Sequence, residues 1–188
     1  MSIALLRSPG GTLLLPDRSA VLLDRADGGN LVVLPSRPVW ERSELTREEL
    51  TQWSYLVAAC GRAMLDVLPH LEGGCINYWE AGNWALNDGA SPPGRKRADQ
   101  HRRMHLHLLG RSRNAANPNW QWGESPVFPR FAERLTWSAL FERLIPAECD
   151  AIGQRARALL AEKYGVDPAR VALGEACRAC GYPSLPLS

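Results

Sequence analysis

The stretch from Gln100 to Gly110, Gln-His-Arg-Arg-Met-His-Leu-His-Leu-Leu-Gly, contains three of the four histidines in a chain of 188 residues. From Arg103 to Leu108 polar and apolar residues alternate, which is typical of a strand with one buried face. Because successive side chains of a strand point to opposite faces, the two kinds of residue separate. The polar face then holds His101, Arg103, His105 and His107, and the face turned to a core holds Met104, Leu106 and Leu108.

Three interpretations of this polar face are open. It is the solvated face of an edge strand, a metal site, or an anion site with a histidine nucleophile. Imidazoles two residues apart on a strand can share a cation. However, Arg103 lies on the same face, with Arg102 and Arg111 close in sequence. Permanent positive charge repels a metal ion and attracts phosphate, so the sequence favours the anion site.

Bulk properties describe an ordinary soluble globular chain, with 45% apolar and 22% charged residues. The net charge of +2 gives no argument for nucleic acid or a membrane as partner. No apolar run approaches the roughly 18 residues of a membrane-spanning helix. The start of the chain lacks the basic and long apolar segments of an export signal. Five scattered cysteines argue against a disulfide framework, so we expect a cytoplasmic protein.

Short apolar runs bounded by turn residues predict the other strands. We expect a hairpin over 12–16 and 20–24, a buried strand over 31–34, and two aromatic strands over 73–79 and 82–89. Thr46 and Glu49 form a capping box that opens a helix. Its apolar residues recur every three or four positions as far as Val67, and Pro69 ends it.

The chain after residue 125 has a helical pattern. A first segment is expected over 135–145, and a longer helix runs from Pro146 to Tyr164 and ends at Gly165. Near the end, Cys177 and Cys180 are spaced as in zinc and redox motifs. Because no second pair stands at metal spacing, and the pair lies near the end of the chain, plain thiols are favoured.

The order of these segments resembles that of the histidine triad (HIT) family of nucleotide hydrolases and transferases, over roughly residues 12–125. The matching segments are Gly28-Gly-Asn-Leu-Val-Val-Leu-Pro35, Glu44-Leu-Thr-Arg-Glu-Glu49, Ala85-Leu-Asn-Asp-Gly89 and His105-Leu-His-Leu-Leu109. The family motif is His-φ-His-φ-His-φ-φ, where φ is apolar. Its second and third histidines correspond to His105 and His107. Arg103 stands in place of the first, and His101 lies one step further out.

The resemblance implies an α+β domain over residues 1–125. In such a domain an antiparallel sheet of about five strands carries the site, and the long helix packs on the sheet. Residues 126–188 then form a C-terminal helical extension. Two subunits commonly pair in the family, so a homodimer is expected.

The resemblance also implies cleavage of a phosphoanhydride, phosphoramidate or phosphoester bond at a nucleoside α-phosphate. His105 attacks the phosphorus and forms a covalent nucleotidyl-histidine, while a main-chain carbonyl on the same strand fixes its tautomer. Imidazole suits this role because its ordinary pKa of about 6.5 leaves it mostly neutral in the cytoplasm. His107 contacts the phosphate or leaving group, and Arg103 offsets charge on the phosphate oxygens. No metal or other cofactor is required.

Other substrate contacts follow from the resemblance. Asn87 corresponds to the asparagine that contacts sugar and phosphate, and Asp24 to the acid that binds the ribose hydroxyls. For these two, a turn asparagine and a strand-end cap are equally open. His101 borders the triad, and the polar residue expected before the triad is Ser91, Asp99 or Gln100. Two departures stand out, because Asn30 and Pro38 occupy positions where many relatives have histidines.

Two other functions stay open. In the first, the chain is a nucleotide-binding regulatory protein in which Arg103 has removed turnover. In the second, it is a metal-dependent hydrolase whose ligands are His101, His105 and His107.

Overall fold

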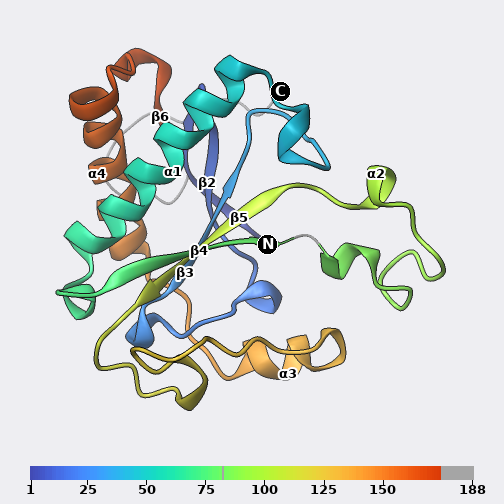
Figure 1. The fold of residues 1–188 in the computed structure, drawn as a ribbon. Helices are drawn as coiled ribbons and strands as arrows, with labels where there is room; N and C mark the ends of the chain where they lie inside the picture. The colour runs from blue at the N-terminus through green and yellow to red at the C-terminus, as the bar shows by residue number, and fades with distance from the viewer. Residues whose placement is uncertain (82, 175–188) are drawn as a thin grey trace.

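The structure is a computed structural model, which describes residues 1–81 and 83–174. In the described part of the chain, six strands form one antiparallel sheet in the order β4-β5-β3-β2-β1-β6 (Figure 1). The strands are β1 (Ile3–Ser8), β2 (Gly11–Leu15), β3 (Asn30–Leu34), β4 (Cys75–Ala81), β5 (His105–Arg111) and β6 (Ala172–Leu173). The expected α+β class is confirmed, with six strands rather than about five.

Helices and short 3-10 turns connect the strands. The α-helices are α1 (Arg47–Val67), α2 (Ala98–His101), α3 (Arg134–Ala139) and α4 (Pro146–Tyr164). The 3-10 turns are η1 (Arg18–Ala20), η2 (Arg25–Asp27), η3 (Arg42–Glu44), η4 (Pro69–Leu71), η5 (Asn83–Leu86), η6 (Pro118–Trp120), η7 (Phe131–Glu133) and η8 (Pro168–Arg170). None of the described helices is both long and apolar enough to cross a membrane.

Helix α1 begins as the sequence predicts. The Thr46 hydroxyl accepts a hydrogen bond from the Glu49 backbone, and the Glu49 carboxylate accepts one from the Thr46 backbone. This capping box satisfies two amides that have no partner within the helix. Helix α4 ends at Gly165, whose left-handed conformation closes the last turn. Both helices pack on the same face of the sheet (Figure 1).

The predicted buried face is present, because Met104, which precedes β5, and Leu106 and Leu108 of the strand all lie in the core beneath α1. The predicted polar face is shorter than expected, since the strand begins at His105. Ala81, the last residue of β4, pairs with His105, so no β4 residue continues the pairing toward Arg103. Arg103 therefore precedes the strand, and His101 ends the short helix α2. The prediction that these two residues extend the strand face is wrong.

The N-terminal hairpin also differs from the prediction. The strand expected over 12–16 is present as β2, but its hairpin partner is β1, a strand that no sequence pattern predicted. The segment 20–24 is not a strand, because it runs between the turns η1 and η2. The Asp17 and Asp24 side chains accept backbone hydrogen bonds that open these turns. The side chains of Val21, Leu22 and Leu23 are nevertheless buried.

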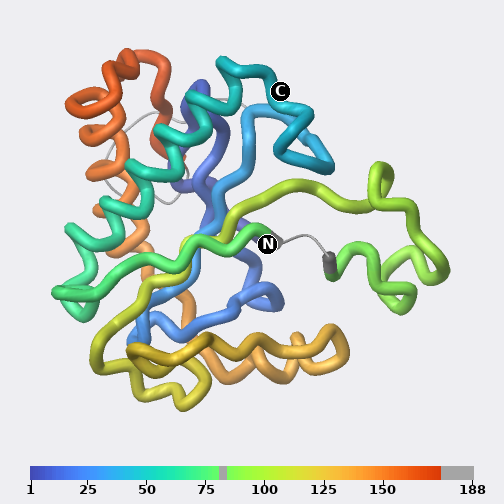
Figure 2. Tube along the Cα trace, in the orientation of Figure 1, coloured from blue at the N-terminus to red at the C-terminus, as the bar shows by residue number. Residues whose placement is uncertain are grey.

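The second aromatic strand is likewise absent. β4 matches the strand expected over 73–79, whereas η5 replaces the strand expected over 82–89. The segment between β4 and β5, which contains η5 and α2, projects from the end of the sheet (Figure 2). Among the described residues, no strand lies beside this segment for it to pair with.

Residues on both sides of position 125 share one hydrophobic core. Ile152, Ala156, Leu159 and Leu160 of α4 belong to the same buried cluster as the sheet residues beneath α1. β6 also extends the sheet by pairing with β1. The division at residue 125 stays a prediction, and Cys177 and Cys180 lie outside the described residues.

Candidate active site

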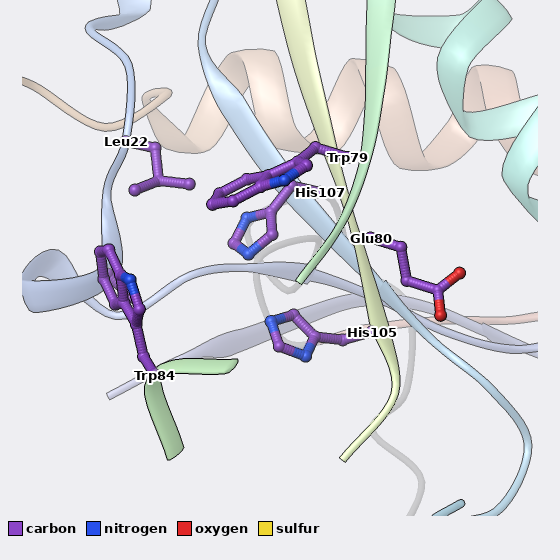
Figure 3. Close-up of a pocket in the computed structure, with 7 residues that line it drawn as sticks. Leu22, Trp79, Glu80, Trp84, His105 and His107 are labelled. Atoms are coloured by element: carbon purple, nitrogen blue, oxygen red, sulfur yellow. The ribbon is translucent and has the colours of Figure 1, made fainter. Parts of the chain in front are cut away.

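The face of the sheet opposite α1 carries a pocket of about 280 Å³ at the start of β5 (Figure 3). Its walls are mostly apolar and aromatic, and two imidazoles form its floor. The lining residues are Ala20, Leu22, Trp79, Glu80, Trp84, His105 and His107. The pocket therefore collects residues from η1, the loop after it, β4, η5 and β5 around two of the histidines predicted to act on substrate.

His105 is held in one orientation by the backbone before it. Its Nδ1 lies 2.8 Å from the carbonyl oxygen of Arg103. A carbonyl oxygen only accepts hydrogen bonds, so Nδ1 must carry the proton. The other nitrogen, Nε2, then has a free lone pair, and it faces the pocket (Figure 3). This is the arrangement in which an imidazole acts as a nucleophile.

His107 differs in its environment, since only 7% of the residue is exposed. Burial, with a smaller contribution from the charge of His105, lowers the pKa of His107 from 6.5 to about 3. The ring is therefore neutral at physiological pH. The ring centres of His105 and His107 lie 5.0 Å apart, in an edge-to-face arrangement. One substrate group can contact both imidazoles.

Aromatic rings support His107 from the neighbouring strand. Trp79 pairs with His107 across β4 and β5, and their ring centres lie 5.3 Å apart. Phe128 stacks on Trp79 with 4.1 Å between ring centres. Trp120 meets Phe128 edge to face and donates from Nε1 to the Gly110 carbonyl. The predicted tryptophan loop is thus packed against the domain near the site.

Charged residues beside the pocket are paired with one another. Glu80 borders the pocket, but its carboxylate points away from the imidazoles (Figure 3). It forms ion pairs with Arg42 and Arg102, and Arg102 also pairs with Glu41. Among the described lining residues, the two imidazoles are therefore the titratable side chains that face the cavity.

Arg103 takes part through its backbone rather than its side chain. Its exposed guanidinium donates to the carbonyl of Arg102, and it does not line the pocket. Gln100 and His101 belong to α2 in the projecting segment and do not line the pocket either. Of the residues predicted around the phosphate, the structure thus brings His105 and His107 together with the Arg103 carbonyl.

Asn87 and Asp24 are engaged in local structure. The Asn87 side chain accepts a hydrogen bond from the Gly89 backbone, as in a turn asparagine. The Asp24 carboxylate accepts from the backbones of Ala26 and Glu142. Neither residue lines the pocket, so the turn and cap interpretations account for both.

The three histidines of the metal alternative are not grouped. Within residues 1–81 and 83–174, no cluster of three or more histidine, cysteine or acidic side chains is arranged to hold a metal ion. His101 sits in α2, apart from the pocket that His105 and His107 line. This arrangement gives the metal alternative no ligand set among the described residues.

The aromatic walls of the pocket were not predicted from the sequence. Trp79 lies in the strand expected over 73–79, so its place in a strand was predictable. Its position opposite His107 depends on the pairing of β4 with β5. Trp84 lies in a segment expected to be a strand, and Leu22 in another. No sequence signal connects Phe128 with Trp79, because the contact joins residues far apart in the chain.

Comparison of the sequence with known proteins identifies no relative, because no protein-family model and no curated protein matches this chain. These comparisons therefore assign neither the fold nor the histidine segment to a family. The function therefore has to be inferred from the chemistry of the pocket.

Proposed function

We propose that this protein is a HIT-like nucleotide hydrolase or nucleotidyl transferase that acts at a nucleoside α-phosphate. The observation that carries the proposal is the hydrogen bond from His105 Nδ1 to the Arg103 carbonyl, at 2.8 Å, which directs the Nε2 lone pair toward the pocket. A histidine pair on an antiparallel strand, backed by a long capped helix, is consistent with the same assignment.

The first step is an exchange of bonds at phosphorus. The Nε2 lone pair of His105 forms a P–N bond, and the bond to the leaving group breaks with its electron pair on that group, which takes a proton from water. The resulting imidazolium keeps its Nδ1 proton, and the Arg103 carbonyl stabilises that positive charge. The oxygen of water, or of another acceptor, then bonds to phosphorus and loses its proton to the solvent. The P–N bond breaks with its electron pair returning to Nε2, which regenerates neutral His105.

The surroundings of His105 divide the remaining roles. His107, neutral and buried, contacts a phosphate oxygen or the leaving group. The apolar walls formed by Leu22, Trp79 and Trp84 suit a planar ring such as a base. Arg103 is exposed beside the pocket, and we propose that its guanidinium turns to the phosphate when substrate binds. Homodimer formation and a cytoplasmic location are further parts of this proposal.

One observation favours a second candidate, a nucleotide-binding regulatory protein without turnover. The guanidinium of Arg103 points to a backbone carbonyl rather than into the pocket, so no described lining residue supplies a fixed cation for the phosphate. Binding in the aromatic pocket does not require that cation, whereas phosphoryl transfer normally uses one.

Covalent trapping separates the two candidates. The protein is mixed with adenylyl-lysine or a dinucleoside polyphosphate, quenched in base, and its peptides are examined by mass spectrometry. We expect a nucleotidyl group on the peptide that contains His105. The His105→Ala variant should lose turnover by at least about a thousandfold, with nucleotide binding retained.

His101→Ala is the matched control, because it removes a histidine that lies outside the pocket. It should keep both the adduct and the rate. Nucleotide binding with no adduct in the wild type would favour the regulatory protein. A His105→Ala variant with the full rate would contradict the proposed mechanism.

A further inference from the structure

Asn30 begins β3 and is almost fully buried, with 3% of the residue exposed. Its side-chain amide has three neighbours. The backbone amide of Leu22 donates to Oδ1 at 3.2 Å, and Nδ2 lies 3.1 Å from the Leu31 carbonyl oxygen. Nδ2 also lies 3.4 Å from Nδ1 of His107. Asn30 therefore connects the wall of the pocket to one of its two imidazoles.

The chemistry of these neighbours fixes which way the amide points. A backbone N–H can only donate, so the side-chain atom facing Leu22 must be the oxygen. The other atom is then the nitrogen, which has two hydrogens to give. One is directed to the Leu31 carbonyl, and the second to His107 Nδ1. Nδ1 of His107 is thus an acceptor, and the proton of this neutral ring lies on Nε2.

We propose that Asn30 is a positioning residue that keeps His107 in the Nε2–H tautomer, so that this imidazole is a fixed hydrogen-bond donor to the phosphoryl group. The inference rests on the proposed function and deepens it. The two imidazoles then have opposite tautomers at a separation of 5.0 Å. His105 presents a lone pair on Nε2, since its Nδ1 donates to Arg103, whereas His107 presents a proton on Nε2.

This assignment limits what His107 does. A neutral imidazole with one proton donates a hydrogen bond but does not transfer the proton, because an imidazolate would result. His107 therefore stabilises charge that develops on a phosphoryl oxygen in both steps and is not itself a second nucleophile. Loss of one such preorganised donor typically lowers kcat by about 100-fold to 1,000-fold.

The resting protein gives the first test. Nitrogen NMR of ¹⁵N-histidine-labelled wild-type protein distinguishes a protonated ring nitrogen from an unprotonated one, and the His107 signals are those missing from His107→Gln. We expect the proton on Nε2 of His107 and on Nδ1 of His105. This measurement needs neither substrate nor a variant of Asn30.

The second test is Asn30→Asp, which keeps an oxygen for the Leu22 amide and replaces the donating nitrogen by an acceptor. The proton of His107 should move to Nδ1, and kcat should fall about 100-fold with KM little changed. The matched control is Asn77→Asp. Asn77 lies opposite Leu109 in β4, just as Asn30 does in β3, but makes no hydrogen bond to His107. It should keep the tautomer and the rate.

Two results would overturn the inference. The first is a wild-type His107 that carries its proton on Nδ1. The second is a folded Asn30→Asp variant in which either the tautomer or kcat is unchanged. A wild-type protein that turns over no nucleotide would refute the proposed function instead. The tautomer in the resting protein still decides the assignment of Asn30 in that case, so the two failures are distinguishable.

Discussion

His105 and His107 stand two residues apart on one face of β5, yet their partners make them chemically different. The carbonyl oxygen of Arg103 accepts from Nδ1 of His105, whereas the side-chain amide nitrogen of Asn30 lies 3.4 Å from Nδ1 of His107. His105 is half-buried at the pocket, whereas His107 is buried beneath Trp79 and beside Asn30. Two identical side chains therefore have different surroundings, because a different atom contacts Nδ1 of each ring, and the roles proposed for them depend on this difference.

The buried ring of His107 should make the stability of the protein depend on pH. Its pKa is lowered from 6.5 to about 3 in the folded state, so between these values the unfolded chain binds a proton that the folded chain excludes. The free energy of unfolding therefore falls as the pH falls through this window, by up to about 1.4 kcal/mol per pH unit. Urea unfolding of wild type and His107→Gln at pH 7 and pH 4.5 measures this.

We expect the wild type to lose more stability than His107→Gln between the two pH values, even if the variant is less stable at pH 7. Carboxyl groups with a lowered pKa, such as Glu49, contribute equally to both proteins and cancel in the comparison. Equal losses in wild type and variant would show that the His107 ring is not kept neutral by burial.

At the scale of elements, the floor of the pocket is held by a stack that joins two strands and a loop. Phe128, from the segment that follows β5, stacks on Trp79 of β4, and Trp79 lies against His107 of β5. Nearby, Trp137 of α3 donates from Nε1 to the Leu22 carbonyl, which holds one wall of the pocket. The described chain beyond residue 125 therefore supports the pocket, although none of its described residues lines the pocket.

Shortening Phe128 should disturb the site without removing any lining residue. We expect Phe128→Ala to lower kcat/KM by about 10-fold to 100-fold, because Trp79 and His107 lose the ring that orients them. The loss of stability should be about 1–3 kcal/mol. Phe131→Ala is the control, since Phe131 is also partly buried but packs against Arg134. Steady-state kinetics of both variants should show the loss only for Phe128→Ala.

At the scale of the whole molecule, one core connects the sheet, α1 and α4. Tyr55 of α1 stacks on Tyr164 of α4 with 4.8 Å between ring centres, and Arg155 of α4 pairs with Asp66 of α1 at 2.8 Å. The buried apolar residues of α4 belong to the same cluster as those of the sheet. Continuous packing of this kind favours cooperative unfolding of the described chain.

Two leucines of the C-terminal part test this continuity. Leu159 of α4 is 2% exposed, whereas Leu140, which follows α3, is 73% exposed. Leu159→Ala should lower the free energy of unfolding by about 2–5 kcal/mol, and Leu140→Ala by less than about 0.5 kcal/mol. Denaturant unfolding followed by tryptophan fluorescence and by circular dichroism should give coincident transitions. Two separate transitions would favour independent units divided near residue 125.

Local patterns in the sequence were sufficient to predict several elements. The alternation from Met104 to Leu108, the capping box at Thr46 and the stop at Gly165 all depend on neighbours within a few positions. The same alternation led to the wrong prediction that β5 reaches back to His101. Alternation within one strand does not indicate where the partner strand ends, and β4 ends opposite His105. The local patterns also missed β1, whose pairing with β2 depends on the rest of the sheet.

The sequence by itself determined the α+β class, both long helices and the presence of His105 and His107 on one strand face. Only the tertiary structure decided that the Arg103 carbonyl meets His105, that the Asn30 amide lies against His107, and that Phe128 stacks on Trp79 at the pocket wall. The physical reason is distance along the chain. Hydrophobic period and capping act within a few residues, whereas Asn30 meets a histidine 77 positions away, through a strand pairing that no local pattern encodes.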